Sequence, residues 1–129
     1  METKIDEVGS LKPGKYVLID GIACVVKDIQ ISKPGKHEST KARVEAIGLV
    51  DEQKRVFVKP THDRIEVPII DKRTAQVLSI HGESATVMDM ETYETFDIKI
   101  PEDLKDNLSE GKQVLYWVIM KEKIMKQLR

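Results

Sequence analysis

Apolar residues along this chain come in short runs, and turn residues interrupt them at intervals of about ten positions. Such spacing is typical of all-β sandwiches and small barrels rather than of helical proteins. In the first seventy residues the pattern predicts strands at 16–19, 22–31, 41–50, 56–59 and 65–70. Five short strands within about seventy residues are typical of a small SH3-like barrel.

Two turn signals in the first half carry the most information. Asp20-Gly21 lies between two apolar runs, and this dipeptide is a strong signal of a two-residue hairpin. Pro34-Gly35, followed by Lys36, interrupts the longer pair of runs. Proline fixes one backbone angle and glycine permits a positive one. We therefore expect a long hairpin that presents Lys36 to solvent at a tight tip.

The second half restarts the pattern after residues 71–74, a charged segment without apolar residues. This segment predicts a short linker between two domains, 1–70 and 71–129. Pro101, the acidic pair Glu102-Asp103 and the leucines at positions 104 and 108 predict a short helix. The expected strands are 75–81, 84–89 and 93–98 before this helix, and 114–120 and 123–128 after it. Three strands, a helix and two strands follow the element order of an OB-fold barrel.

The composition excludes several classes of protein. The chain has 129 residues, 40% of them hydrophobic and 33% charged, as is normal for a folded soluble protein. No apolar run approaches the roughly 18 residues of a membrane span, so we expect no membrane association. Cys24 is the single cysteine, which fits a reducing cytoplasm, and the acidic N-terminus does not resemble a signal peptide. These features predict a cytoplasmic protein.

Charge is unevenly distributed along the chain. Residues 32–43 carry a net charge of +3 within a chain of net charge −1, so the remaining residues carry −4. A local positive pole on an acidic body can steer one end of a protein toward phosphate, although ordinary solvated lysines give the same pattern. Residues 71–129 hold nine basic and eleven acidic side chains. Four of the acidic residues cluster around one expected hairpin: Asp89, Glu91, Glu94 and Asp97. This cluster argues against a general single-strand binder of the basic-groove type.

No arrangement of residues predicts catalysis or a metal site. His37 has no visible base or nucleophile partner, and His62 and His81 lack ligand spacing with any cysteine. Gly35-Lys36 fails as a phosphate-binding loop, because Gln30 stands at the first glycine position of that motif. The aromatic residues are expected to pack in the cores or at their rims. We therefore expect a protein that is not an enzyme.

Residues 32–37, Ser-Lys-Pro-Gly-Lys-His, lie in the long expected hairpin and resemble the modification loop of the translation initiation factor 5A family in its archaeal form. That family is related to bacterial elongation factor P. Residues 16–21 with Cys24, residues 41–44 and residues 67–73 resemble the family's first hairpin, the strand leaving the loop and the interdomain junction. The element order agrees over essentially the whole chain. One departure is Glu38, because the family usually has glycine there.

The resemblance implies a fold and a function. The family's fold is an all-β SH3-like barrel followed by an OB-fold barrel with one short helix. Its members are non-enzymatic translation factors in which deoxyhypusine synthase transfers an aminobutyl group from spermidine to one lysine, here Lys36. The hypusine or deoxyhypusine arm then contacts the acceptor end of peptidyl-tRNA on the ribosome, and no other cofactor is implied. The residues implied in contacts with RNA are Lys33, Pro34, Gly35, His37, Lys41 and Arg43. The alternative is an RNA-binding adaptor that uses the basic loop of residues 33–43 unmodified.

Overall fold

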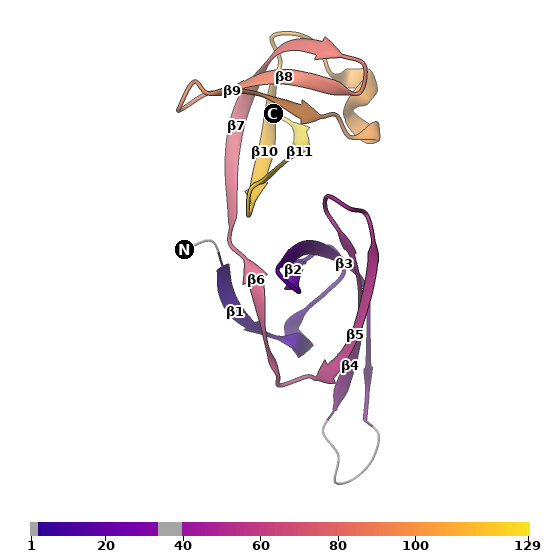
Figure 1. The fold of residues 1–129 in the computed structure, drawn as a ribbon. Coiled ribbons are helices and arrows are strands. Elements are labelled where there is room, and N and C mark those ends of the chain that lie inside the picture. Colours follow the sequence, from indigo (N-terminus) through magenta and orange to yellow (C-terminus); the bar gives the residue numbers. More distant parts are fainter. Residues whose placement is uncertain (1–2, 34–39) are drawn as a thin grey trace. The chain divides into compact units, whose positions relative to one another are not determined.

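The computed structural model describes residues 3–33 and 40–129, and the chain divides into two compact units, Met1–Ile69 and Ile70–Arg129 (Figure 1). The division falls one residue before the expected boundary. Both units are built almost entirely from antiparallel strands, as the sequence pattern predicts. Among the described residues, no helix is long and apolar enough to cross a membrane.

The N-terminal unit consists of a four-stranded sheet and a two-stranded sheet (Figure 1). The larger sheet has the order β2-β3-β4-β5, and the smaller one pairs β1 with β6. Its elements are β1 (Thr3–Glu7), a 3-10 turn (Val8–Ser10), β2 (Tyr16–Ile19), β3 (Ile22–Ser32), β4 (Lys41–Gly48), β5 (Lys54–Pro60) and β6 (Arg64–Pro68). The hairpin predicted at Asp20-Gly21 is confirmed, because both residues have positive φ angles, 52° and 78°, and Ile19 pairs with Ile22.

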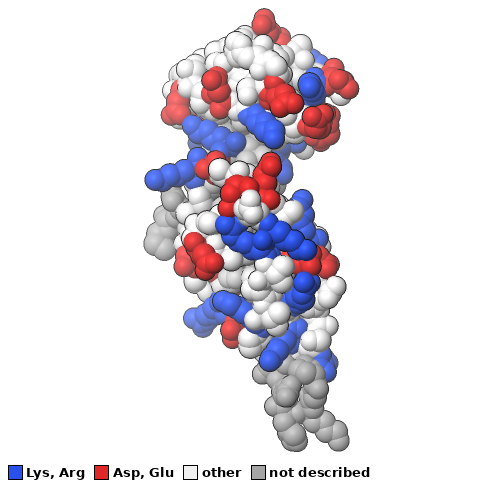
Figure 2. Space-filling model, turned by 45° about the vertical axis from the view of Figure 1, so that its right-hand side comes forward, with Lys and Arg blue, Asp and Glu red and all other residues white. Residues whose placement is uncertain are grey.

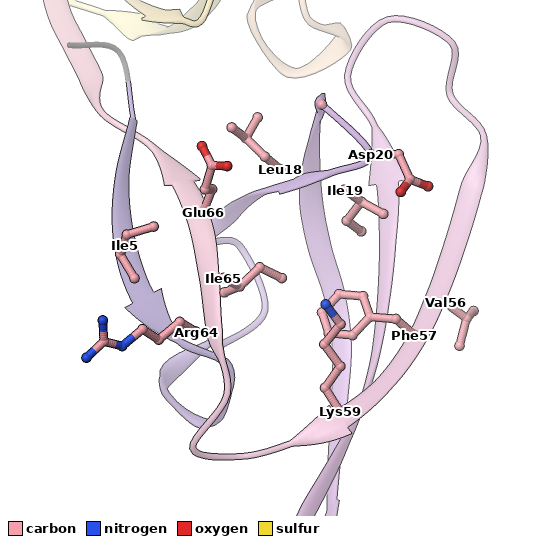
Figure 3. Close-up of a pocket in the computed structure, with 11 residues that line it drawn as sticks. Ile5, Leu18, Ile19, Asp20, Val56, Phe57, Lys59, Arg64, Ile65 and Glu66 are labelled. Atoms are coloured by element: carbon pink, nitrogen blue, oxygen red, sulfur yellow. The ribbon is translucent and has the colours of Figure 1, made fainter.

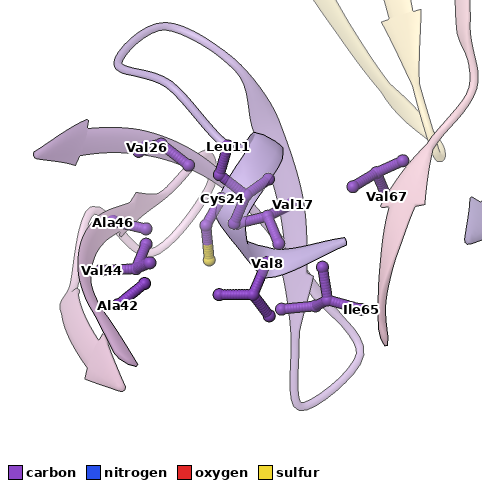
Figure 4. Close-up of a cluster of buried hydrophobic side chains, with 10 residues drawn as sticks. All are labelled: Val8, Leu11, Val17, Cys24, Val26, Ala42, Val44, Ala46, Ile65 and Val67. Atoms are coloured by element: carbon purple, nitrogen blue, oxygen red, sulfur yellow. The ribbon is translucent and has the colours of Figure 1, made fainter. Parts of the chain in front are cut away.

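One cluster of aliphatic side chains fills this unit (Figure 4). Strand β4 shows how the sequence builds it, because Ala42, Val44 and Ala46 are fully buried while the residues between them face away. Cys24 also belongs to the cluster. Burial raises the pKa of its thiol, so Cys24 is a packing residue rather than a reactive one.

The C-terminal unit is a five-stranded sheet of order β11-β10-β7-β8-β9, in which β9 and β11 also lie in contact. Its elements are β7 (Ile70–His81), β8 (Ser84–Asp89), β9 (Thr95–Lys99), a 3-10 helix (Glu102–Asn107), β10 (Gln113–Ile119) and β11 (Glu122–Leu128). The helix predicted after Pro101 is therefore present, with 3-10 geometry. A second apolar cluster, which includes Val77, Val87 and Val114, forms the core of this unit.

The linker predicted at residues 71–74 is wrong. These residues form the first part of β7, where Asp71 pairs with Val118 and Thr74 with Leu115 of β10. Hydrophilic composition predicted a loop, but the backbone is hydrogen-bonded in a ladder, and the charged side chain of Arg73 has a partner inside the unit.

That partner is Asp89, which the sequence analysis counted in an acidic cluster around one hairpin and which is only 1% exposed. Its carboxylate accepts hydrogen bonds from Arg73 Nε at 2.6 Å and Nη2 at 3.1 Å, and from Tyr116 Oη at 2.5 Å. The backbone amides of Glu91 and Thr92 donate two more, at 2.8 and 2.9 Å. The Arg73 guanidinium holds the pKa of Asp89 well below its usual range. Asp89 therefore ties β7, β10 and the turn after β8 together.

Candidate functional site

The candidate site lies at the end of the β3–β4 hairpin where residues 33–40 connect the two strands. The two strands pair antiparallel from Cys24 opposite Gly48 to Ser32 opposite Lys41, with one irregularity in register between Val26 and Asp28. The structure does not describe five residues that the sequence analysis singled out: Pro34, Gly35, Lys36, His37 and Glu38. The structure therefore defines the stem from which this segment begins and to which it returns.

The stem places two of the predicted RNA-contacting residues on one face. In β4, Lys41 and Arg43 alternate with Ala42 and Val44, whose side chains are buried in the core. Because successive side chains of a strand point to opposite faces, Lys41 and Arg43 project away from the core. Strand β5 supports them from the other side, since Arg43 pairs with Val58. Lys33 follows β3 directly and is exposed.

The positive charge of this face is smaller than the sequence count suggested. Arg43 Nη1 lies 2.7 Å from Glu45 Oε1, and Lys54 Nζ lies 3.6 Å from the same oxygen. The hydrogen bond from Arg43 is the main cause that lowers the pKa of Glu45. Among the described residues, neither Lys33 nor Lys41 takes part in an ion pair.

Glu45 and Lys54 were missed by the sequence reasoning. The two-residue periodicity of β4 could have placed Glu45 beside Arg43, whereas Lys54 reaches it only through the register of β5. On the face that Figure 2 shows, basic side chains of the N-terminal unit are interspersed with acidic ones. The stem is therefore suited to contacts between individual lysines and phosphate groups. It does not present one broad electropositive surface on the face shown.

Within residues 3–33 and 40–129, no group of three or more His, Cys, Asp or Glu side chains is placed to hold a metal ion. The chemistry that this part of the chain offers is amine chemistry and phosphate contact by Lys33, Lys41 and Arg43.

Comparisons with known proteins agree with this geometry. A model of the "Translation initiation factor 5A-like, N-terminal" family matches residues 1–62. A model described as "Eukaryotic elongation factor 5A hypusine, DNA-binding OB fold" matches residues 69–129. Translation initiation factor 5A of Methanothermobacter thermautotrophicus is 55% identical over 116 residues, which cover 90% of this chain and 89% of that protein. The same factor of Methanosphaera stadtmanae is 53% identical over 116 residues, with 90% and 88% covered. The chain belongs to the translation initiation factor 5A family.

Solved structures confirm the predicted fold class for this family member. The structure of eukaryotic translation initiation factor 5A from Methanococcus jannaschii superposes with a TM-score of 0.88 at 45% identity, covering 99% of this chain and 96% of that one. A family protein from Naegleria fowleri gives a TM-score of 0.69 at 26% identity, covering 100% and 99%. The SH3-like barrel and the following OB-fold are thus the architecture of the whole chain, and its field of action is translation and protein biosynthesis.

Proposed function

We propose that Lys36 is the acceptor of an aminobutyl group from spermidine, which deoxyhypusine synthase transfers to give deoxyhypusine or hypusine. A bond forms between Lys36 Nζ and the terminal carbon of the butyl group, while the bond from that carbon to the secondary nitrogen of spermidine breaks and releases diaminopropane. The ε-amine of free lysine has a pKa near 10.4, so the synthase must remove a proton before the nitrogen can attack. The family description that names hypusine supports the modification, and the resemblance of residues 32–37 to the modification loop of the family points to Lys36 as the acceptor.

The modified arm places a second amine beyond the reach of an ordinary lysine. In the proposed function the factor binds the ribosome, and the arm lies near the acceptor end of peptidyl-tRNA, where it promotes peptide-bond formation. Lys33, Lys41 and Arg43, with Pro34, Gly35 and His37, contact the RNA backbone and position the arm without reading sequence. The factor acts in the cytoplasm and is itself no enzyme.

One observation carries this proposal. The β3–β4 ladder is paired through Ser32 and Lys41, so residues 33–40, eight in number, connect two strand ends held side by side. Lys36 stands in the middle of this short connection. The proposed function requires that Lys36 be available at this end of the hairpin both to a synthase and to RNA.

Peptide-bond formation on ribosomes tests the function. We expect protein from its native source to raise the rate of slow peptide-bond formation on ribosomes. The same chain made in bacteria without the synthase should leave that rate unchanged. Equal stimulation by both preparations would instead support the unmodified RNA-binding adaptor.

Charge reversal on the stem tests the RNA contacts. The double substitution Lys33→Glu and Arg43→Glu should weaken ribosome binding about tenfold or more and reduce its salt slope by about two, because two phosphate contacts are lost. Stability should change by about 1 kcal/mol at most, since the Arg43–Glu45 pair is exposed.

The matched control for that experiment reverses two exposed lysines elsewhere in the same unit, Lys12→Glu with Lys27→Glu. It makes the same change in net charge and should leave the salt slope near its original value. An equal loss in the control and the stem variant would show that only overall charge matters.

A further inference from the structure

Strand β5 is the last strand of its sheet, and its outer edge has no strand partner among the described residues. Two bonds that flank its ladder with β4 show which residues face that edge. Thr61 N donates to Thr40 O at 2.9 Å, and Gly48 N donates to Gln53 O at 3.0 Å. Hydrogen-bonded pairs alternate in an antiparallel ladder, so residues 55, 57 and 59 bond to β4 while 54, 56 and 58 point outward.

Val56 and Val58 therefore direct their backbone N–H and C=O groups to the open edge. No backbone or side-chain hydrogen bond in the described part of the chain uses these groups. The two valine side chains are also exposed, by 45% and 58%. An exposed edge of β-branched residues is a template for pairing with another strand.

The edge borders a hollow of about 650 Å³ (Figure 3). Strands β5 and β6 are joined by a short turn, where Asp63 N donates to Pro60 O at 3.0 Å, yet they belong to different sheets. They separate beyond that turn, and the hollow lies between them. Phe57, Ile65, Leu18 and Ile19 supply an apolar lining.

The two ends of the hollow carry opposite charge. Lys59 lies at the end near the turn, and Asp20 and Glu66 lie at the other end, whereas the Arg64 side chain extends from β6 away from the hollow (Figure 3). None of these four side chains takes part in an ion pair with another described residue. Lys59 Nζ lies 5.7 Å from the centroid of the Phe57 ring, so an acidic residue of an occupant would draw Lys59 away from this ring and open its face.

A second copy of the chain fits this edge poorly. If β5 paired antiparallel with β5 of another copy at full overlap, Arg55 of each would stand opposite Lys59 of the other. Like charges directly opposite each other destabilise a strand pair. The edge thus favours a partner of different sequence.

We propose that the slot between β5 and β6 binds an extended peptide segment of another protein by strand addition to β5. The segment runs antiparallel to β5, because antiparallel pairing matches the rest of the sheet and is the more stable arrangement. It exchanges backbone hydrogen bonds with Val56 and Val58 and places alternate apolar side chains over Phe57 and Ile65. Acidic residues precede these apolar residues and meet Lys59, and basic residues follow them toward Asp20 and Glu66. This site is separate from Lys36 and does not depend on its modification.

Hydrogen exchange of individual amides tests the pairing. The probe is a peptide of alternating valine and threonine with two glutamates before it and two lysines after it. In the free protein the amides of Val56 and Val58 should exchange fast, and those of Arg55 and Phe57 slowly. Saturating peptide should slow Val56 and Val58 about tenfold or more, whereas slowing that grows with protein concentration alone would point to a second copy and overturn the proposal.

Charge order provides the matched control. A peptide with lysines first and glutamates last should bind about tenfold more weakly. The variant Lys59→Glu should lose this preference, and Val58→Pro, which removes an outward N–H and no hydrogen bond to β4, should bind neither peptide. The variant Lys12→Glu with Lys27→Glu should behave as the unaltered protein. Failure of the first peptide to bind, or equal binding of both charge orders, would refute strand addition at this slot.

Discussion

Asp89→Ala is expected to lower the free energy of unfolding of the C-terminal unit by about 3 kcal/mol, because the substitution removes the acceptor for five hydrogen bonds. Tyr116 Oη would be left buried without its partner, and Arg73 would keep only its exposed neighbours. A unit of about sixty residues has roughly 3–9 kcal/mol of stability in total. The variant should therefore lose between about a third and all of the stability of this unit.

Trp117 is the single tryptophan and lies in β10, so its fluorescence reports urea unfolding of this unit. Asp89→Asn keeps the size of the side chain but loses the charge. Its free energy of unfolding should fall between those of the unaltered protein and Asp89→Ala. Asp97→Ala serves as the control, since this carboxylate is exposed and bonds only Thr86 Oγ1 among the described residues. A loss below about 1 kcal/mol in Asp89→Ala would contradict a structural role for the buried carboxylate.

The same contacts predict a pH dependence with two limits. The pKa of Asp89 is lower in the folded unit than in the unfolded chain, where it is near 3.9. The stability that the ionised carboxylate of Asp89 contributes is therefore complete above about pH 3.9 and is lost as the pH falls below that value. Burial raises the pKa of Tyr116 to about 12, from about 10 in the unfolded chain. The stability that the protonated hydroxyl of Tyr116 contributes is therefore complete below about pH 10 and is lost as the pH rises toward 12. Urea midpoints should therefore fall at both extremes, and less in Asp89→Asn at the acidic one.

Lys36→Arg is expected to abolish incorporation of label from spermidine by the cognate synthase. Arginine keeps the positive charge, but its guanidinium cannot be deprotonated in proteins and cannot accept the aminobutyl group. The fold should be unaffected, because the substitution lies in the connection beyond the Ser32–Lys41 pair. Radiolabelled spermidine and purified synthase give the measurement.

Two neighbouring lysines supply the matched controls for that loss. Lys33→Arg and Lys41→Arg should still be labelled, since they flank the acceptor without being it. Glu38→Gly restores the residue usual in the family, and it should label faster if the negative charge of Glu38 hinders the reaction. Label that persists in Lys36→Arg would place the acceptor elsewhere.

The sequence predicted those strands whose signals are local. Asp20-Gly21 located a hairpin because both positions need positive φ, and residues 84–89 alternate cleanly between the two faces of a sheet. The pairing of β3 with β4 was predictable from the two apolar runs on either side of Pro34-Gly35. What the sequence could not supply was the partner of a weakly apolar segment.

Strand β1 shows this limit. Thr3–Glu7 has one apolar residue, Ile5, which is 59% exposed, and the segment is a strand because it pairs with β6. Residues 71–74 read as a linker because they are charged, yet β10 pairs with them and Asp89 receives Arg73. At the site, the charge count overlooked Glu45 because it lies outside the loop that was counted. Each miss concerns a contact between residues far apart in sequence or outside the motif.

The mass of the native protein tests the central claim most directly. Intact protein from its natural source should exceed the mass of the same chain made in bacteria by one aminobutyl group, with or without an added oxygen. Fragmentation should place that excess on Lys36 and on no other lysine. A native mass equal to that of the unmodified chain, or an excess located on another residue, would contradict the account.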